Sequence, residues 1–198
     1  MISRESTALH KFAAELKTGG TDVRNATPFP FSFLTCPTTP SPPASTTTQA
    51  AAFPISDYTY KEVQTAFRAV RTQWPTSDIR VALYNAGFGV WKPFLQLTED
   101  EVDKVIDTNV KAAFAFSREA ITAFQGQGND EHGKRGTLLF TGATASLRGN
   151  TTTSSFSAAK FALRSLSQSL NKEFGKENIH VCASLWRVFF FFLMNLDR

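Results

Sequence analysis

After residue 57, hydrophobic residues follow two patterns. Some recur every three to four positions, as on one face of a helix, and others form short continuous runs. The helical spacing predicts three helices, from Thr59 to about Pro75, from Thr98 through Phe124, and from about Ser155 to a stop at Gly175. The first two open with a Thr-x-x-Glu pair, which is typical of a capping box at a helix N-terminus. We therefore expect helices of substantial length in this half of the chain.

Short apolar runs lie between and after these helices. They predict buried strands at Ile79–Leu83, Leu138–Phe140 and Ile179–Leu185. Strands that alternate with helices imply right-handed crossovers and a mostly parallel sheet with helices on both faces. Because such sheets bind ligands beyond the carboxyl ends of their strands, we expect the chemistry in the loops Asn85–Phe88 and Thr141–Ser146.

The flanks of this pattern differ in composition from its centre. Residues 1–24 hold a strand remnant and a helical pattern, and residues 25–50 form a loop or disordered insert rich in Pro, Thr and Ser. We assign residues 51–186 to the α/β core and residues 187–198 to an apolar tail. The run from Val188 to Met194 is much shorter than the ~20 residues that cross a bilayer, so no membrane span is expected.

Composition narrows the function only slightly. The formal charge of +4 is spread along the chain, which gives no support to nucleic-acid binding. Cys36 and Cys182 show no metal-ligand spacing, and no metal site is expected. The N-terminus lacks the layout of a secretory signal, so we expect a protein of the reducing cytoplasm.

Four segments carry a recognisable pattern in a fixed order. They are VALYNAG ending at Gly87, IDTNVKAAF around Asn109, GTLLFTGATASLRG, and FSAAKFAL from Phe156 to Leu163. In order and spacing they resemble the short-chain dehydrogenase/reductase family over about Asp57 to Leu185. This resemblance implies an incomplete doubly wound Rossmann-like fold and hydride transfer between a nicotinamide cofactor, NADP or NAD, and a small carbonyl or alcohol substrate.

The resemblance also implies cofactor-binding residues. Asn85, Ala86 and Gly87 match the family's NNAG segment on the adenosine side, although Tyr84 replaces the first Asn. These residues equally suit a structural turn. Asp57 resembles an acidic residue near adenine, or serves helix entry. Arg4 stands where an Arg of relatives favours the 2′-phosphate of NADP, so NADP is the preferred expectation.

The catalytic residues of the family are only partly matched. Asn109 would hold a water and Lys160 would bind the nicotinamide ribose, but Phe156 stands at the place of the proton-donating Tyr. Phe has no hydroxyl, and loss of a general acid typically costs ~10²–10⁴ in rate. The family's Ser corresponds to Ala143; Thr141, Thr144 and Ser146 are the nearby hydroxyls, and we choose Thr144 to line the substrate side with Phe156.

Two family segments have no counterpart in this sequence. Neither the phosphate-binding turn TGxxxGxG nor the Pro-Gly segment after the last strand is present. We therefore expect a truncated or mis-assembled oxidoreductase, impaired in turnover and forming a homo-oligomer if it folds. The alternative is a non-catalytic derivative of the family that serves as an interaction module.

Overall fold

The computed structural model describes residues 2–3 and 51–186, in two compact units divided after Ser56. In the first unit, β1 (Ile2–Ser3) pairs in parallel with β2 (Phe53–Pro54). Arg4, the helical pattern within residues 1–24, the insert at 25–50 and the tail at 187–198 lie outside the described residues. Predictions made for them therefore remain predictions.

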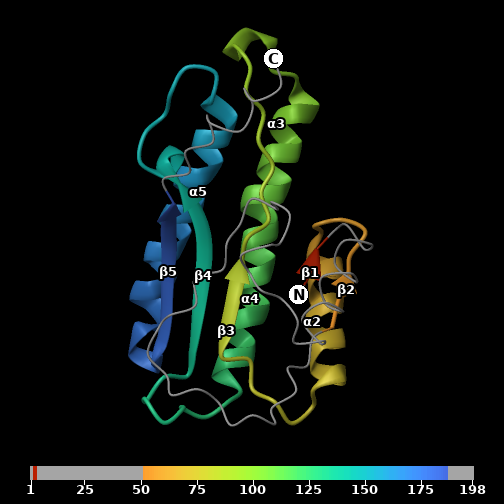
Figure 1. Cartoon of the computed structure of the whole chain (residues 1–198), viewed down its shortest axis with the longest axis vertical. Coiled ribbons are helices and arrows are strands. Elements are labelled where there is room, and N and C mark those ends of the chain that lie inside the picture. The colour runs from red at the N-terminus through yellow and green to blue at the C-terminus, as the bar shows by residue number, and fades with distance from the viewer. Residues whose placement is uncertain (1, 4–50, 187–198) are drawn as a thin grey trace, which may run out of the picture. The chain divides into compact units, whose positions relative to one another are not determined.

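The second unit is built on a three-stranded parallel sheet, as expected (Figure 1). The strands are β3 (Val81–Tyr84), β4 (Gly136–Ala143) and β5 (Ile179–Trp186), in the order β3-β4-β5. The prediction that the first of them starts at Ile79 was wrong by two residues. The Ile79 carbonyl accepts a hydrogen bond from Gln127 Nε2 at 2.7 Å, so a side chain takes the place of a strand partner there.

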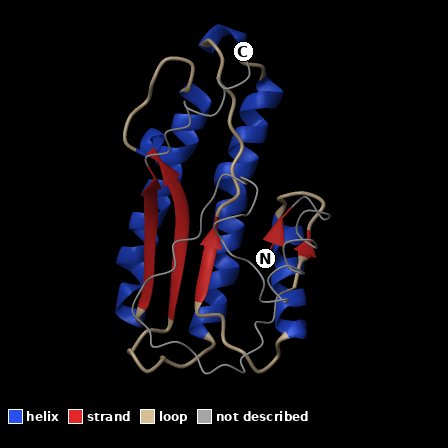
Figure 2. Cartoon of the chain, viewed as in Figure 1, coloured by secondary structure: helices blue, strands red, loops and turns tan. Residues whose placement is uncertain are grey.

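Within residues 57–186, four helical segments accompany the sheet, and shorter helical turns join them (Figure 2). The long ones are α2 (Tyr60–Gln73), α3 (Glu99–Ile106), α4 (Ala112–Gln125) and α5 (Ser154–Phe174), and the short ones are η1 (Phe94–Gln96), η2 (Asp107–Lys111), η3 (Thr144–Ser146) and η4 (Gly175–Glu177). The capping box of α3 is present, because Thr98 Oγ1 accepts from Glu101 N and Glu101 Oε2 accepts from Thr98 N.

The long helix predicted from Thr98 through Phe124 is confirmed as one continuous helical run, with a π-helical turn inside it. This turn, η2, lies between α3 and α4. A single inserted turn of this kind leaves the apolar stripe nearly continuous, so spacing alone does not reveal it. None of the helices in the described ranges is long and apolar enough to serve as a membrane span.

The core lies between the sheet and helices α4 and α5, both of which lie behind it in Figure 1. Leu138 and Phe140 of β4 are fully buried there, together with Phe124 of α4. A Cβ atom at Gly136 would come within 2.3 Å of the Phe124 ring, so glycine is what lets this helix pack closely on β4. On the other face of β3, Val81 and Leu83 are 61% and 44% exposed.

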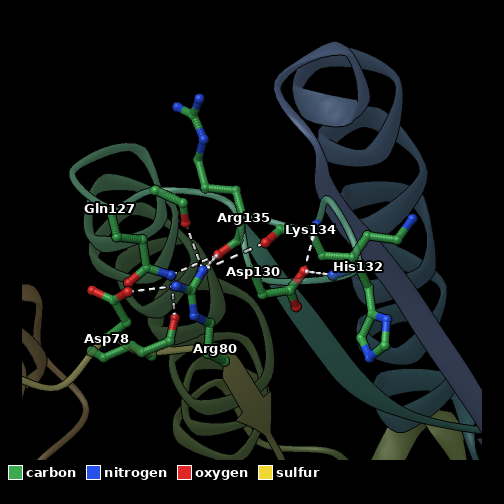
Figure 3. Close-up of polar contacts among 9 residues, drawn as sticks. Asp78, Arg80, Gln127, Asp130, His132, Lys134 and Arg135 are labelled. Carbon is green, nitrogen blue, oxygen red and sulfur yellow. Dashed lines mark hydrogen bonds and ion pairs between the residues drawn. The ribbon is translucent and has the colours of Figure 1, made fainter.

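A cluster of polar contacts fastens the loops at the amino-terminal edge of the sheet (Figure 3). Arg80 Nη1 donates to the carbonyl oxygens of Gly128 at 2.6 Å and Arg135 at 3.2 Å, and Arg80 Nη2 bonds to Asp78 Oδ2 at 2.5 Å. Asp130 Oδ1 accepts from the backbone nitrogen of Lys134 at 2.7 Å. These bonds satisfy main-chain groups of the α4–β4 loop and hold the start of β3 against it.

Candidate functional site

Three polar residues meet where β3 and β4 end. The register pairs Tyr84 with Phe140, so Asn85 lies beside Thr141, and the Thr141 hydroxyl donates to Asn85 Oδ1 at 2.7 Å. Lys160 reaches this edge from α5, and its Nζ donates to the Thr141 carbonyl at 2.8 Å. Lys160 is only 5% exposed. The parallel register thus brings together residues from the loop after β3, from β4 and from α5 at the carboxyl edge, where ligands bind in open α/β sheets.

Asn109 enters the same region from the π turn η2. It is fully buried, and its Nδ2 donates to the carbonyls of Phe88 at 2.7 Å and Val105 at 2.8 Å. Its Oδ1 has no hydrogen-bond partner among the described residues. Because an unsatisfied buried acceptor costs about 1–3 kcal/mol, this atom is suited to accept from a water or a ligand group.

Gly87 lies between these two side chains. A Cβ atom at this position would be 3.4 Å from Asn109 Oδ1 and 3.7 Å from Lys160 Nζ. The acceptor and the amine therefore both border the space beside an exposed glycine. The absence of a side chain at Gly87 leaves room for a ligand to approach both groups at once.

Phe156 forms an aromatic wall next to the amine. Lys160 Nζ lies 5.7 Å from the centre of the Phe156 ring, as expected for residues one helical turn apart. Trp91, from the loop after β3, packs on the same ring with the centroids 5.2 Å apart. A Cβ atom at Gly89 would collide with both rings, at 2.7 Å from Trp91 and 2.9 Å from Phe156. The sequence patterns did not indicate a role for Trp91 or Gly89. The Gly-Phe-Gly sequence ending at Gly89 was the one local feature that pointed to this loop.

The hydroxyl groups of Thr141, Thr144 and Ser146 differ in their hydrogen-bond partners. Thr141 donates to Asn85, and the fully buried Ser146 accepts from the Ala143 backbone nitrogen at 3.1 Å. No hydrogen bond joins the Thr144 hydroxyl to another residue within the described ranges. Thr144 is half-buried at the start of η3 and is the hydroxyl of this loop that remains available.

The other predicted site residues have structural contacts or lie outside the description. Asp57 Oδ1 accepts from the backbone nitrogen of Thr59 at 2.8 Å at the entrance of α2, in agreement with the helix-entry alternative. Ala86 is half-buried in the loop between Asn85 and Gly87. Arg4 is not among the described residues. The site that the structure brings together is thus formed by Asn85, Gly87, Asn109, Phe156 and Lys160.

Burial governs the ionisation of the two buried titratable groups here. Desolvation lowers the pKa of Lys160 from its ordinary value to about 8. Burial, and then the nearby Tyr58, raise the pKa of Tyr84 well above its usual value. The Tyr84 hydroxyl donates to the Thr108 carbonyl and therefore fastens β3 to η2 as a neutral group. Lys160 is the group of this site whose charge changes near neutral pH.

Comparison with known proteins agrees with this geometry. A family model described as short chain dehydrogenase matches residues 42–185. A 3alpha-hydroxysteroid dehydrogenase from Mediterraneibacter gnavus is 31% identical over 122 residues, which are 62% of this chain and 46% of that protein. The chain thus spans less than half the length of this relative.

Solved structures show the same fold. A 3-ketoacyl-ACP reductase from Sinorhizobium meliloti superposes with a TM-score of 0.70 at 21% identity, covering 93% of this chain and 60% of that one. A 4-hydroxyisoleucine dehydrogenase complexed with NADH and succinate gives a TM-score of 0.58 at 25% identity, covering 67% of this chain and 58% of that one.

Proposed function

Because the chain belongs to the short-chain dehydrogenase family, we propose that it is an NAD(P)-dependent oxidoreductase by descent, with impaired turnover. The observation that supports this most is the convergence of Asn85, Asn109 and Lys160 beside Gly87 at the carboxyl edge of the sheet. The substrate class is a small carbonyl compound or alcohol. A bound nicotinamide supplies or accepts the hydride, and the protein supplies orientation and protons.

The residues present fit the ribose end of a nicotinamide nucleotide. The Lys160 ammonium uses one of its three N–H groups on the Thr141 carbonyl, which leaves two for ribose hydroxyls. Asn109 Oδ1 is a buried acceptor without a partner in the described chain, and a water held there would link it towards Lys160. Asn85, Ala86 and Gly87 would lie along the adenosine side, with Asp57 near the adenine. Arg4 directly follows β1 in the sequence and would favour NADP over NAD through the 2′-phosphate.

Proton transfer is the step that this chain performs poorly. The Phe156 ring lies beside Lys160 but carries no ionisable proton. The reacting oxygen therefore has to receive its proton from water or from the Thr144 hydroxyl. Phe156 and Thr144 would line the substrate side. The ordinary pKa of a Thr hydroxyl is too far from neutrality for an efficient general acid. Slow turnover follows from the residue types at these positions.

We predict weak nucleotide binding that depends on Lys160. Titration calorimetry and ligand-observed NMR with NADPH and NADH should give dissociation constants weaker than the micromolar range. Lys160→Met should weaken binding a further ~10-fold or more, because a charge-assisted hydrogen bond contributes about 1.5–3 kcal/mol.

Lys172→Met is the matched control, since Lys172 is exposed in the last turn of the same helix. It should bind the nucleotides as the unmodified chain does. Equal binding by the Lys160 variant and the control would contradict the assigned site. Micromolar or tighter binding by the unmodified chain would contradict the impairment.

A second candidate function, a non-catalytic interaction module, is favoured by the exposed aromatic side chains of two helices. Phe114 of α4 is 57% exposed and Phe161 of α5 is 41% exposed, whereas Phe174 at the end of α5 is half-buried. We propose that these helices carry a homo-oligomer contact, with Phe114 and Phe161 in it.

This contact predicts a concentration-dependent association. Sedimentation analysis should show a dimer or larger species, and Phe114→Asp with Phe161→Asp should shift it towards monomer by ~10-fold or more in dissociation constant, since buried aromatic anchors contribute ~2 kcal/mol or more each. Leu95→Asp, at a residue that is 93% exposed in η1, is the control. An unmodified chain that stays monomeric at high concentration would end this alternative.

A further inference from the structure

We propose that the side-chain amine of Lys160 is a nucleophile that condenses with small aldehydes to form an imine, an activity separate from hydride transfer. The inference rests on the cluster formed by Lys160, Asn109, Gly87 and the Phe156–Trp91 ring pair. It does not require a bound nucleotide.

The first requirement is an amine that is not held in an ion pair. Lys160 Nζ donates to a neutral carbonyl, that of Thr141, and faces the Phe156 ring, and no carboxylate of the described chain forms an ion pair with it. A phenol at position 156 would compete for the same amine, but Phe156 offers only its ring face. Burial lowers the pKa of Lys160 to about 8, so a large share of the amine is neutral at mildly alkaline pH.

The second requirement is a place for the carbonyl compound. Gly87 is exposed, and the position of its missing side chain lies 3.7 Å from Lys160 Nζ and 3.4 Å from Asn109 Oδ1. Because Lys160 is only 5% exposed, a carbonyl carbon has to approach along this side to react with the amine. The buried Asn109 Oδ1, unpartnered in the described chain, can accept from the hydroxyl group that forms on that carbon.

The third feature concerns the rest of the aldehyde. The Phe156 ring lies beside Nζ, and Trp91, which is 59% exposed, continues the wall with its ring 5.2 Å from that of Phe156. Flat apolar groups stack favourably on such rings. We therefore assign the preference to aldehydes with an aromatic substituent, such as benzaldehyde, over acetaldehyde.

The reaction balances without an oxidant or reductant. The Nζ lone pair attacks the carbonyl carbon, the C=O pair moves to oxygen, and a proton moves from nitrogen to that oxygen to give a carbinolamine. The nitrogen lone pair then forms C=N as the hydroxyl leaves with a proton as water. Aldehyde and amine become imine and water, and the reverse reaction releases the aldehyde.

Reductive trapping tests the proposal on the full chain. Benzaldehyde and sodium cyanoborohydride at pH 8 should convert the imine into a stable benzyl amine, located by peptide mass mapping. An amine with a pKa of about 8 has a roughly 100-fold larger neutral fraction at this pH than an ordinary lysine. Lys160 should therefore be labelled at least ~10-fold faster than an exposed lysine such as Lys172, and acetaldehyde should label it more slowly than benzaldehyde.

Two variants and one ligand complete the test. Lys160→Arg should lose the adduct and Lys172→Arg should keep it, and site mapping in the unmodified chain decides the matter even if Lys160→Arg does not fold. Labelling spread evenly over surface lysines, with Lys160 unmodified, would overturn the inference. Millimolar NADPH should slow labelling at Lys160; labelling that NADPH leaves unchanged would count against the proposed nucleotide site and leave the imine chemistry standing.

Discussion

Phe156→Tyr should raise the rate of NADPH-dependent carbonyl reduction by ~10²–10⁴, the typical contribution of a positioned general acid. The substitution places a phenol on the helix face that already carries Lys160, whose amine lies 5.7 Å from the ring centre. A nearby ammonium lowers the pKa of a phenol and brings it closer to the working pH. The measurement is the loss of NADPH absorbance with a panel of small ketones and aldehydes, expressed as kcat/KM.

Two companion variants separate catalysis from simple addition of a phenol. Phe161→Tyr adds the same hydroxyl to an exposed position of the same helix and should leave the rate unchanged. Phe156→Tyr combined with Lys160→Met should lose most of the gain, because the phenol then has no cation beside it. If Phe156→Tyr is as slow as the Phe161 control, proton transfer is not what limits this chain.

Phe124→Ala should lower the free energy of unfolding by ~3–5 kcal/mol, as is usual for a fully buried Phe. Such a loss is a large share of the ~5–15 kcal/mol by which most domains are stable, so the variant should unfold at a much lower urea concentration than the unmodified chain. Urea denaturation followed by circular dichroism measures it. Thr122→Ala, at an exposed position of the same helix, should change stability by less than ~0.5 kcal/mol.

The contact between Phe124 and Gly136 makes this prediction sharper. Gly136→Ala alone should cost ~1–3 kcal/mol, because its Cβ would lie 2.3 Å from the Phe124 ring. Combined with Phe124→Ala, the added methyl group enters space that the ring has left, so the two losses should not add and the coupling should reach ~1–3 kcal/mol. Additive losses would show that α4 does not rest on β4 at this point.

The sequence predicted the elements with strong local signals. The Thr98–Glu101 capping box and the apolar run around Leu138 to Phe140 correspond to the start of α3 and the centre of β4. Both signals act over a few residues, so a single sequence suffices to read them. The start of β3 was misplaced because the Ile79 carbonyl is bound by Gln127, a residue 48 positions away.

The site was predictable to a similar extent. The motifs indicated Asn85, Asn109, Phe156 and Lys160, and the structure brings Asn109 and Lys160 to either side of Gly87. The π turn that carries Asn109 was missed because it hardly alters the hydrophobic spacing. The packing of Trp91 on Phe156 was missed because it joins the loop after β3 to helix α5, two segments far apart in the sequence. Contacts of this kind depend on the tertiary fold and leave little trace in local patterns.

Arg80 and Asn85 stand at opposite ends of β3, which places the polar cluster and the candidate site ~16 Å apart at the usual rise of a strand. Substitutions separated by more than ~7–10 Å and without shared partners normally contribute independently. Stabilising substitutions can therefore be introduced near Arg80 first, and the loop residues around Gly87 can then be randomised in that stabilised variant. A gain in activity from substitutions around Gly87 would then not be hidden by a loss of folding stability, because the substitutions near Arg80 act independently of them.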